Sequence, residues 1–363
     1  MRRRRPHILS PLVGILLCIA PYSPLASEPG KTESACVSCH RSRSELQPQT
    51  PMGRALALPA TNPVLKENPK LTVRKGAYTY TVETHGDEST YNVSDGTRTI
   101  SIPIRWNFGA GAQTWVLEHD GRRYESAVSY YPSIPGLDFT TGDEDLKPRN
   151  LEEAIGREIG IAETKVCFGC HASNAVTNGK MTFESLRPGV TCEHCHVGTI
   201  SHLVDSLNGD FDSAPPDLRK WSSEDISSFC GQCHRSWETV VRNHWRGPLT
   251  VRFQPYRLAN SRCFDGADTR ISCIACHDPH VDVVRQESSY DANCLACHGP
   301  SSAGSTFSST PASRASLPQA KPCPTSKSDC VSCHMPKVKL PNGHLTFTDH
   351  QIRIVKPREQ FPN

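Results

Sequence analysis

Cysteine and histidine recur in one fixed frame along this sequence of 363 residues. In the stretch ISCIACHDPH, residues 271–280, two residues separate Cys273 from Cys276, and His277 follows at once. The same Cys-x-x-Cys-His frame occurs seven times and takes up 14 of the 17 cysteines. The seven frames are Cys36, Cys39, His40; Cys167, Cys170, His171; Cys192, Cys195, His196; Cys230, Cys233, His234; Cys273, Cys276, His277; Cys294, Cys297, His298; and Cys330, Cys333, His334.

This frame is the attachment signature of c-type haem, in which two cysteines hold the porphyrin edge and the adjacent histidine binds the iron as proximal ligand. A zinc ribbon uses two Cys-x-x-Cys knuckles for one tetrahedral site and needs no histidine after each. A thioredoxin-like dithiol occurs once, within a βαβ pattern, and no such pattern is visible here. The sequence therefore predicts seven covalently attached haems c, numbered 1 to 7 in chain order.

Other histidines could fill the distal axial positions of these irons. An iron with two protein ligands is suited to electron transfer, whereas turnover of a substrate at iron needs an open position. His85 and His119 lie on predicted strand or turn residues and are not favoured. The candidate distal ligands are His280, His350, His344, His244, His194, His202 and, for haem 1, Met52.

His280 is predicted to bind a haem other than the one beside it in the sequence. Pro279 disfavours helical geometry at Asp278, so the chain turns away from the proximal helix of haem 5 at this point. Within three residues of His277, His280 cannot easily reach the opposite face of the same porphyrin. We therefore expect it to be the distal ligand of a neighbouring haem.

Two further cysteines, Cys263 and Cys323, lie outside the frames and outside the N-terminal segment. A disulfide between them is the expected arrangement in an exported protein. Two free thiols or an unusual iron ligand are the alternatives.

The elements that must position the haems fall into two kinds. Residues 61–150 alternate Val, Thr, Tyr and Ile between turn dipeptides such as Asp120-Gly121, which predicts a β-rich insert of antiparallel hairpins between haem 1 and haem 2. A helix is expected over 151–166, and a Ser/Pro-rich loop over 300–326. The expected fold class is a multihaem cytochrome c, mostly short α-helices and loops packed around covalent haems. Its expected parts are a haem 1 segment (27–60), the β-rich insert, a haem-rich domain (151–340) and a C-terminal tail (341–363).

The first residues predict export. Arg2 to Arg5 precede an apolar stretch from Ile8 to Ala20, which together indicate a signal peptide over residues 1–26. The chain has 40 Lys and Arg against 37 Asp and Glu. Without those four arginines it carries 36 basic residues, and haem propionates would add negative charge, so nucleic-acid binding has no electrostatic support. We expect a periplasmic or otherwise exported protein.

The sequence also resembles bacterial multihaem cytochromes c of the cytochrome c554-like and nitrite-reductase-related superfamily, above all exported members that often carry tetratricopeptide repeats. The resemblance covers most of residues 33–356. It rests on TPMGRAL (50–56), RWNFGAGAQTWVLEHDGRRYESAVSYY (105–131), SCIACHDPH (272–280) and DCVSCHMPKVKLPNGHLTFTDHQI (329–352). No repeat array is present in the 363 residues, so no role of such repeats is implied. The Cys-x-x-Cys-Lys frame of pentahaem nitrite reductases is absent from the sequence, which disfavours that activity.

These observations favour a heptahaem cytochrome that relays single electrons along a haem chain, more an electron-transfer protein than an enzyme. The alternative is a multihaem oxidoreductase acting on a small nitrogen or sulfur compound, such as nitrite, hydroxylamine or a sulfur oxyanion, at one open haem. A third interpretation gives residues 61–145 a docking role in a larger redox complex. The expected partners are redox proteins, with association with a membrane redox complex as a further expectation.

Overall fold

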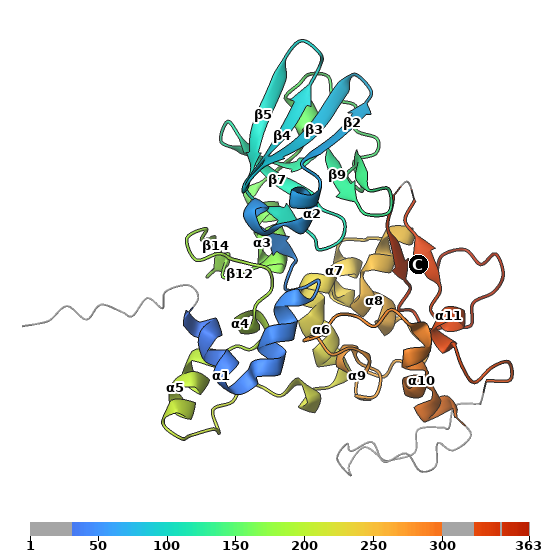
Figure 1. Cartoon of the computed structure of the whole chain (residues 1–363). Helices are drawn as coiled ribbons and strands as arrows, with labels where there is room; N and C mark the ends of the chain where they lie inside the picture. The colour runs from blue at the N-terminus through green and yellow to red at the C-terminus, as the bar shows by residue number, and fades with distance from the viewer. Residues whose placement is uncertain (1–30, 300–322, 342, 363) are drawn as a thin grey trace, which may run out of the picture.

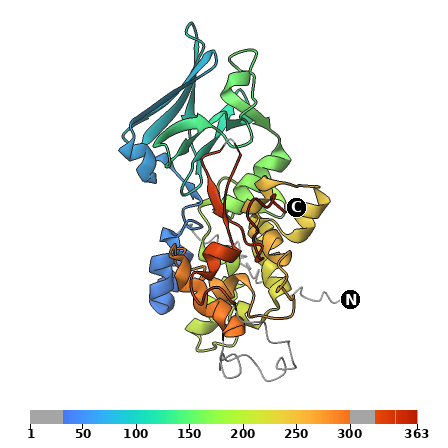
Figure 2. The same ribbon diagram turned by 90° about the vertical axis from the view of Figure 1, so that its right-hand side faces the viewer.

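The chain divides into a strand-rich part and a helical part, which lie one above the other in Figures 1 and 2. This computed structural model describes residues 31–299, 323–341 and 343–362. The predicted signal peptide lies outside the described residues, as does most of the predicted loop over 300–326. Within the described residues, no helix combines the length and the apolar content needed to cross a bilayer.

The strand-rich part contains two main antiparallel sheets. One sheet has the order β2-β3-β4-β5, and the other has the order β1-β6-β7-β8-β11. The strands are β1 (Leu56–Ala57), β2 (Lys70–Lys75), β3 (Tyr78–His85), β4 (Glu88–Ser94), β5 (Thr99–Ile104), β6 (Asn107–Phe108), β7 (Thr114–His119), β8 (Arg122–Ser126), β9 (Val128–Tyr131), β10 (Gly136–Phe139) and β11 (Gly156–Ile159). Asp120 and Gly121 both have positive φ in the β7–β8 hairpin, as a two-residue type I′ turn requires. Antiparallel sheets thus occupy the segment where alternation predicted them.

Buried aromatic and aliphatic side chains fill the space between these sheets. Alternate residues of β3 and β4 point inward, and Tyr80, Tyr91 and Trp115 lie at the centre of the cluster. A second cluster contains Leu56, Phe108 and Phe168. It joins the sheet β1-β6-β7-β8-β11 to the helix that carries the second Cys-x-x-Cys-His frame. The strand-rich part is therefore anchored directly above the helical part.

Short helices carry all seven frames. They are α1 (Lys31–Leu46), α3 (Ile161–His171), α4 (Cys192–Cys195), α6 (Ser223–His234), α9 (Cys273–Cys276), α10 (Asp291–His298) and α11 (Cys330–His334). The others are α2 (Pro63–Glu67), α5 (Thr199–Leu207), α7 (Trp237–Arg242) and α8 (Gln254–Ala259). Figure 1 shows α1, α4, α6, α9, α10 and α11 following one another from left to right across the lower half of the molecule.

More of the chain is strand than the sequence indicated. Small hairpins also occur within the haem-rich region and the tail: β12 (Ala172–Ser173) with β15 (Arg187–Pro188), β13 (Val176–Thr177) with β14 (Lys180–Met181), and β16 (Lys337–Lys339) with β17 (Thr346–Thr348). The helix expected over 151–166 is wrong in its first half. Gly156 has φ +150, and residues 156–159 form β11, which pairs with β8, so the helix begins only at Ile161.

Candidate haem sites

One helical turn is enough to build each attachment frame. Side chains at positions i, i+3 and i+4 of a helix share one face, so the two cysteines and the histidine of a frame point the same way. The backbone N–H of His196 donates to the Cys192 carbonyl (2.8 Å), and that of His277 donates to the Cys273 carbonyl (2.9 Å). Four of the helices, α3, α6, α10 and α11, end at the histidine itself. In α1 the helix is kinked at His40.

Three of the frame histidines, predicted proximal ligands, each face a second histidine from a distant part of the chain. The ring centroids are 6.5 Å apart for His40 and His202, 6.0 Å for His196 and His280, and 6.2 Å for His277 and His350. A metal–imidazole bond is about 2 Å long, so two rings on opposite sides of one metal have centroids roughly 6 Å apart. The spacing of all three pairs therefore fits one iron between the rings.

Several of these imidazoles are oriented through Nδ1 by an acceptor. His171 Nδ1 donates to the Ala55 carbonyl (2.9 Å). His334 Nδ1 donates to the Arg353 carbonyl (2.8 Å), and His350 Nδ1 donates to the Thr348 carbonyl (3.0 Å). A proton on Nδ1 leaves the lone pair of Nε2 available for a metal, and such a partner also fixes the ring orientation.

Burial keeps many of the site histidines neutral. Removal from water lowers the pKa of His171, His196, His234 and His277, and it lowers the pKa of His350 to about 4. A neutral imidazole is the form that binds metal, so these side chains have the required protonation state at neutral pH.

Cysteines of different frames lie against one another. Cys170 of the second frame contacts Cys233 of the fourth, and this hydrogen bond lowers the pKa of Cys170 to about 7. Cys230 of the fourth frame similarly contacts Cys273 of the fifth, which raises the pKa of Cys230. In the sixth and seventh frames, burial first, then contacts with Asp291 and Cys294, raise the pKa of Cys330 to about 12. Porphyrin edges held by touching cysteines would be close together.

The donor set matches haem better than a bare metal ion. Within the described ranges, no group of three or more His, Cys, Asp or Glu side chains could hold a metal ion by itself. Haem iron needs only one or two axial protein ligands because the porphyrin supplies the others. The frames, the facing imidazoles and their Nδ1 partners therefore fit covalent haem c, with iron bound by histidine.

The other predicted distal ligands are in none of these three pairs. His344 places Nε2, the atom that would bind iron, 2.8 Å from Asp138 Oδ2. His244 is exposed. His194 has Nδ1 3.5 Å from Ser173 Oγ, which leaves Nε2 available, so its ligation stays a prediction. The ring that faces His40 belongs to His202, which makes Met52 unnecessary as a ligand of haem 1.

The expected disulfide is not formed in the structure. Cys263 and Cys323 are both free and exposed. Cys263 instead lies close enough to Cys297 for the two thiols to interact electrostatically, whereas backbone N–H groups of residues 325 and 326 surround Cys323 and lower its pKa. The predicted disulfide is therefore wrong, and each thiol has other neighbours.

Sequence patterns did not reveal the charged residues that support the histidines. Asp278 Oδ1 and Arg43 Nη1 lie 2.7 Å and 2.8 Å from His280 Nδ1. Arg257 and Asp349 form a fully buried ion pair next to His350. Asp278 and Asp349 could have been found from the sequence, because they lie two residues and one residue before a candidate ligand. Arg43 and Arg257 could not, because they are distant in sequence from the histidines they support.

Comparison with known proteins supports the same class. Residues 141–197, which include the second and third frames, match the family model described as cytochrome c554 and c-prime. The structure resembles that of the outer cell wall cytochrome OcwA with a TM-score of 0.50, at 14% sequence identity, over 89% of this chain and 79% of that one. A search of curated proteins gave no significant match. The resemblance to multihaem c-type cytochromes is thus confirmed at that level.

Proposed function

We propose that this multihaem c-type cytochrome carries seven haems and relays single electrons along them between redox proteins. The observation that carries the proposal is the three facing histidine pairs, His40 with His202, His196 with His280, and His277 with His350. Two axial histidines leave no open position on an iron, which favours electron transfer over binding of a substrate. When bound, the haems supply reversible one-electron chemistry, and the protein's part is to hold and orient them.

The contacts between frames support a continuous path. The first and third frames lie close together, since His40 and Arg43 are near enough to His196 to influence its pKa. Haems 1 and 3 would therefore be adjacent. Cys195 of haem 3 is near Cys230 and Cys233 of haem 4.

The path continues through the cysteine contacts described above. Cysteines of the fourth frame contact those of the second and fifth frames, and cysteines of the sixth and seventh frames contact each other. The fifth and sixth frames are joined through Asn293 of α10, whose Nδ2 donates to the Ala275 carbonyl (3.3 Å). Haems held by these frames would be close together. The proposed order in space is 1, 3, 4, 5, 6, 7, with haem 2 beside haem 4.

Export and redox partners are part of the same proposal. Haem is attached at Cys-x-x-Cys-His frames outside the cytoplasm, and the predicted signal peptide over 1–26 would direct the chain there. The structural neighbour is named as an outer cell wall cytochrome, which is in keeping with an exported protein. Donor and acceptor would be redox proteins, including a membrane redox complex. N-terminal sequencing of the mature protein tests the cleavage.

The second candidate function is a multihaem oxidoreductase acting on a small nitrogen or sulfur compound. It would need one haem iron without a distal protein ligand.

Mass spectrometry and a spin-state count test the proposal. The mature protein should carry seven covalent haems, and a low-temperature spectrum should show at least three low-spin haems. A smaller number of haems in fully matured protein would contradict the count. A spectrum dominated by high-spin haems with exchangeable ligands would transfer support to the oxidoreductase.

A further inference from the structure

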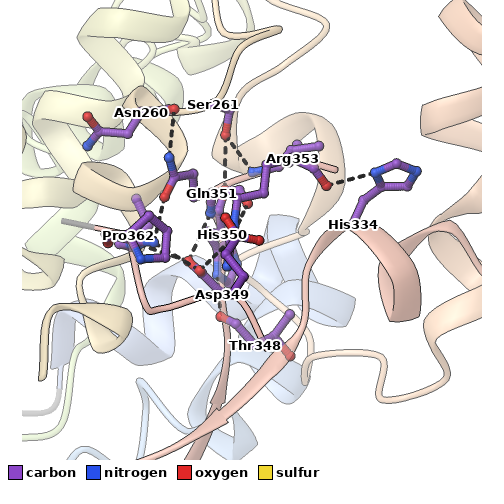
Figure 3. Close-up of polar contacts among 12 residues, drawn as sticks. Asn260, Ser261, His334, Thr348, Asp349, His350, Gln351, Arg353 and Pro362 are labelled. Atoms are coloured by element: carbon purple, nitrogen blue, oxygen red, sulfur yellow. Dashed lines mark hydrogen bonds and ion pairs between the residues drawn. The ribbon is translucent and has the colours of Figure 1, made fainter. Parts of the chain in front are cut away.

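The C-terminal tail contacts two haem frames that are far apart in the sequence. Residues 348–353 run between the end of α8 and the helix α11, as Figure 3 shows. His350 lies in this stretch and faces His277 of the fifth frame. The carbonyl of Arg353, three residues later, accepts from His334 of the seventh frame. One short segment thus reaches both sites.

His350 is oriented as a ligand for the iron of haem 5. Its ring centroid is 6.2 Å from that of His277, with 49° between the ring planes. Its Nδ1 donates to the Thr348 carbonyl at 3.0 Å, which leaves Nε2 available on the opposite edge. The side chain therefore has the position, the tautomer and the neutral state that a distal ligand needs.

The same segment also holds His334, the frame histidine of haem 7. Its Nδ1 donates to the Arg353 carbonyl at 2.8 Å, and the Arg353 backbone N–H donates back to the His334 carbonyl at 3.2 Å. The ring of a haem 7 ligand is thus fixed by a carbonyl that lies three residues from a haem 5 ligand.

A buried ion pair fixes the tail between these two histidines. Arg257 of α8 and Asp349 have fully buried side chains and form two parallel hydrogen bonds, Nε to Oδ1 at 2.8 Å and Nη2 to Oδ2 at 2.9 Å. The guanidinium also donates to the Gln351 side chain (2.6 Å) and to the Pro362 carbonyl (2.7 Å). Phe361 stacks on it at 4.4 Å. Every guanidinium nitrogen of Arg257 therefore has a partner in the tail.

Ser261, two residues after α8, holds the backbone on both sides of Gln351. Its Oγ donates to the His350 carbonyl (3.2 Å) and accepts from the Ile352 N–H (2.8 Å). Gln351 Nε2 donates to the Asn260 carbonyl (3.2 Å). Successive residues of the tail are thereby attached to α8 or to the residues just after it. Apolar packing would stabilise the folded protein equally well. Two charges buried out of water are a costly means of holding a segment, but they fix its register by a planar, bidentate geometry.

We propose that residues 348–353 form one strap that serves two haems, with His350 as the distal ligand of haem 5 and the Arg353 carbonyl as the orienting partner of His334 at haem 7. Arg257 and Asp349 are positioning residues that lock this strap to α8. The proposal rests on the proposed function in that it requires haems 5 and 7 to be attached.

The first experiment compares two tail histidines in the mature holoprotein. His350→Ala should retain all its haems, because no cysteine is changed, and should convert one low-spin ferric haem to high-spin in the electron paramagnetic resonance spectrum. Added imidazole should restore the low-spin signal. His344→Ala is the matched control and should leave the haem spectrum unchanged, because Nε2 of His344 is bound to Asp138. If His350→Ala keeps every low-spin signal of the wild type, the ligand assignment is overturned.

The second experiment tests the lock. Arg257→Lys keeps the charge but cannot form the two parallel bonds. It should shift the midpoint potentials of two haems: the one identified by His350→Ala and a second one, haem 7. Arg219→Lys, in an exposed pair with Asp217, is the control and should shift neither. If Arg257→Lys does not fold, Ser261→Ala, which removes both Oγ contacts, takes its place with the same expectation.

The outcomes separate this proposal from the proposed function. A shift limited to one haem, or no shift, in Arg257→Lys and Ser261→Ala would overturn the shared strap while leaving electron transfer intact. A wild-type protein without low-spin haems would overturn the proposed function before any variant is compared.

Discussion

The imidazole of His280 lies opposite that of His196, and its Nδ1 is within 2.8 Å of Arg43 on α1. It therefore joins the loop after haem 5 to the frames of haems 1 and 3. His280→Ala should leave the number of attached haems unchanged and convert one low-spin haem to high-spin, because it removes the distal ligand that we assign to haem 3. Electron paramagnetic resonance of the ferric protein measures this. An unchanged low-spin spectrum would show that His280 is not a ligand.

Asp278 should tune the same haem. Its Oδ1 accepts the His280 backbone N–H at 2.9 Å and lies 2.7 Å from His280 Nδ1. In the tautomer that leaves Nε2 for iron, Nδ1 carries the proton and donates it to Asp278 rather than accepting from Arg43. A carboxylate on the ligand makes the imidazole a stronger donor and favours ferric iron. Asp278→Asn should therefore raise the midpoint potential of that haem, by about 60 mV if the preference for ferric iron falls tenfold. Asp282→Asn, an exposed neighbour, is the control. Equal potentials in the two variants would contradict the assignment.

Asp143 gives a pH prediction at residue scale. It is nearly buried, Oδ2 has no hydrogen-bond partner, and burial together with Glu125 raises its pKa to about 6. A carboxyl whose pKa is raised on folding contributes stability below its unfolded pKa, near 4, and this stability is lost as pH rises through about 6. Asp143→Asn should therefore be more stable than wild type at pH 8, by up to about 3 kcal/mol, and similar to it below pH 4.

Thermal unfolding across this pH range measures the Asp143 effect. Asp145→Asn removes an exposed negative charge from the same loop and serves as the control. A stability difference that is constant from pH 4 to pH 8 would rule out titration of Asp143 as the cause.

At the scale of elements, the periodicity of the sequence predicted those strands whose pairing depends on residues close together in the chain. Alternation and the Asp120-Gly121 turn indicated the antiparallel hairpins, because strand pairing there is between neighbours in the chain. The pattern of residues 156–159 also suits a helix, and it is their pairing with residues 123–126 of β8 that makes them a strand. The sequence identified candidate distal histidines but could not assign each one to a proximal histidine. His344 and His350, on either side of β17, are six residues apart, yet His344 contacts Asp138 and His350 faces His277.

A close backbone contact joins the haem 1 segment to the approach to haem 3. Val190 N–H donates to the Met52 carbonyl (3.0 Å), and Gln47 Nε2 donates to the Val190 carbonyl (2.6 Å). Gly189 has φ +77, and a Cβ there would collide with the Gly53 carbonyl oxygen. Gly189→Ala should therefore destabilise the protein well beyond the roughly 1–2 kcal/mol cost of the left-handed backbone alone.

Gly179→Ala separates the two effects at Gly189. Gly179 has a similar φ of +71, but its Cβ would meet open space. Chemical denaturation followed by circular dichroism should show a larger loss for Gly189→Ala than for Gly179→Ala. Equal losses would mean that the contact with Gly53 is not a tight junction.

At the scale of the whole molecule, the frames follow a spatial order that differs from their sequence order. The helices α1, α4, α6, α9, α10 and α11 cross the lower half in succession, whereas α3, with haem 2, lies between the sheets and α6 (Figure 1). Cys170 contacts Cys233, so in the proposed order haem 2 would join the row from the side at haem 4. Haem 4 would occupy the junction, because cysteines of the second, third and fifth frames lie next to Cys230 and Cys233.

Removal of haem 4 should therefore divide the path, whereas removal of haem 2 should not. A photosensitiser attached at Glu45→Cys, in a background of Cys263→Ser and Cys323→Ser, would inject electrons next to haem 1. In the double variant Cys230→Ala with Cys233→Ala, the fast phase of haem reduction should be limited to the amplitude of haems 1 and 3. In the matched variant Cys167→Ala with Cys170→Ala, the fast phase should extend to all remaining haems. Transient absorption measures both amplitudes, and fast reduction beyond haems 1 and 3 without haem 4 would refute the proposed order.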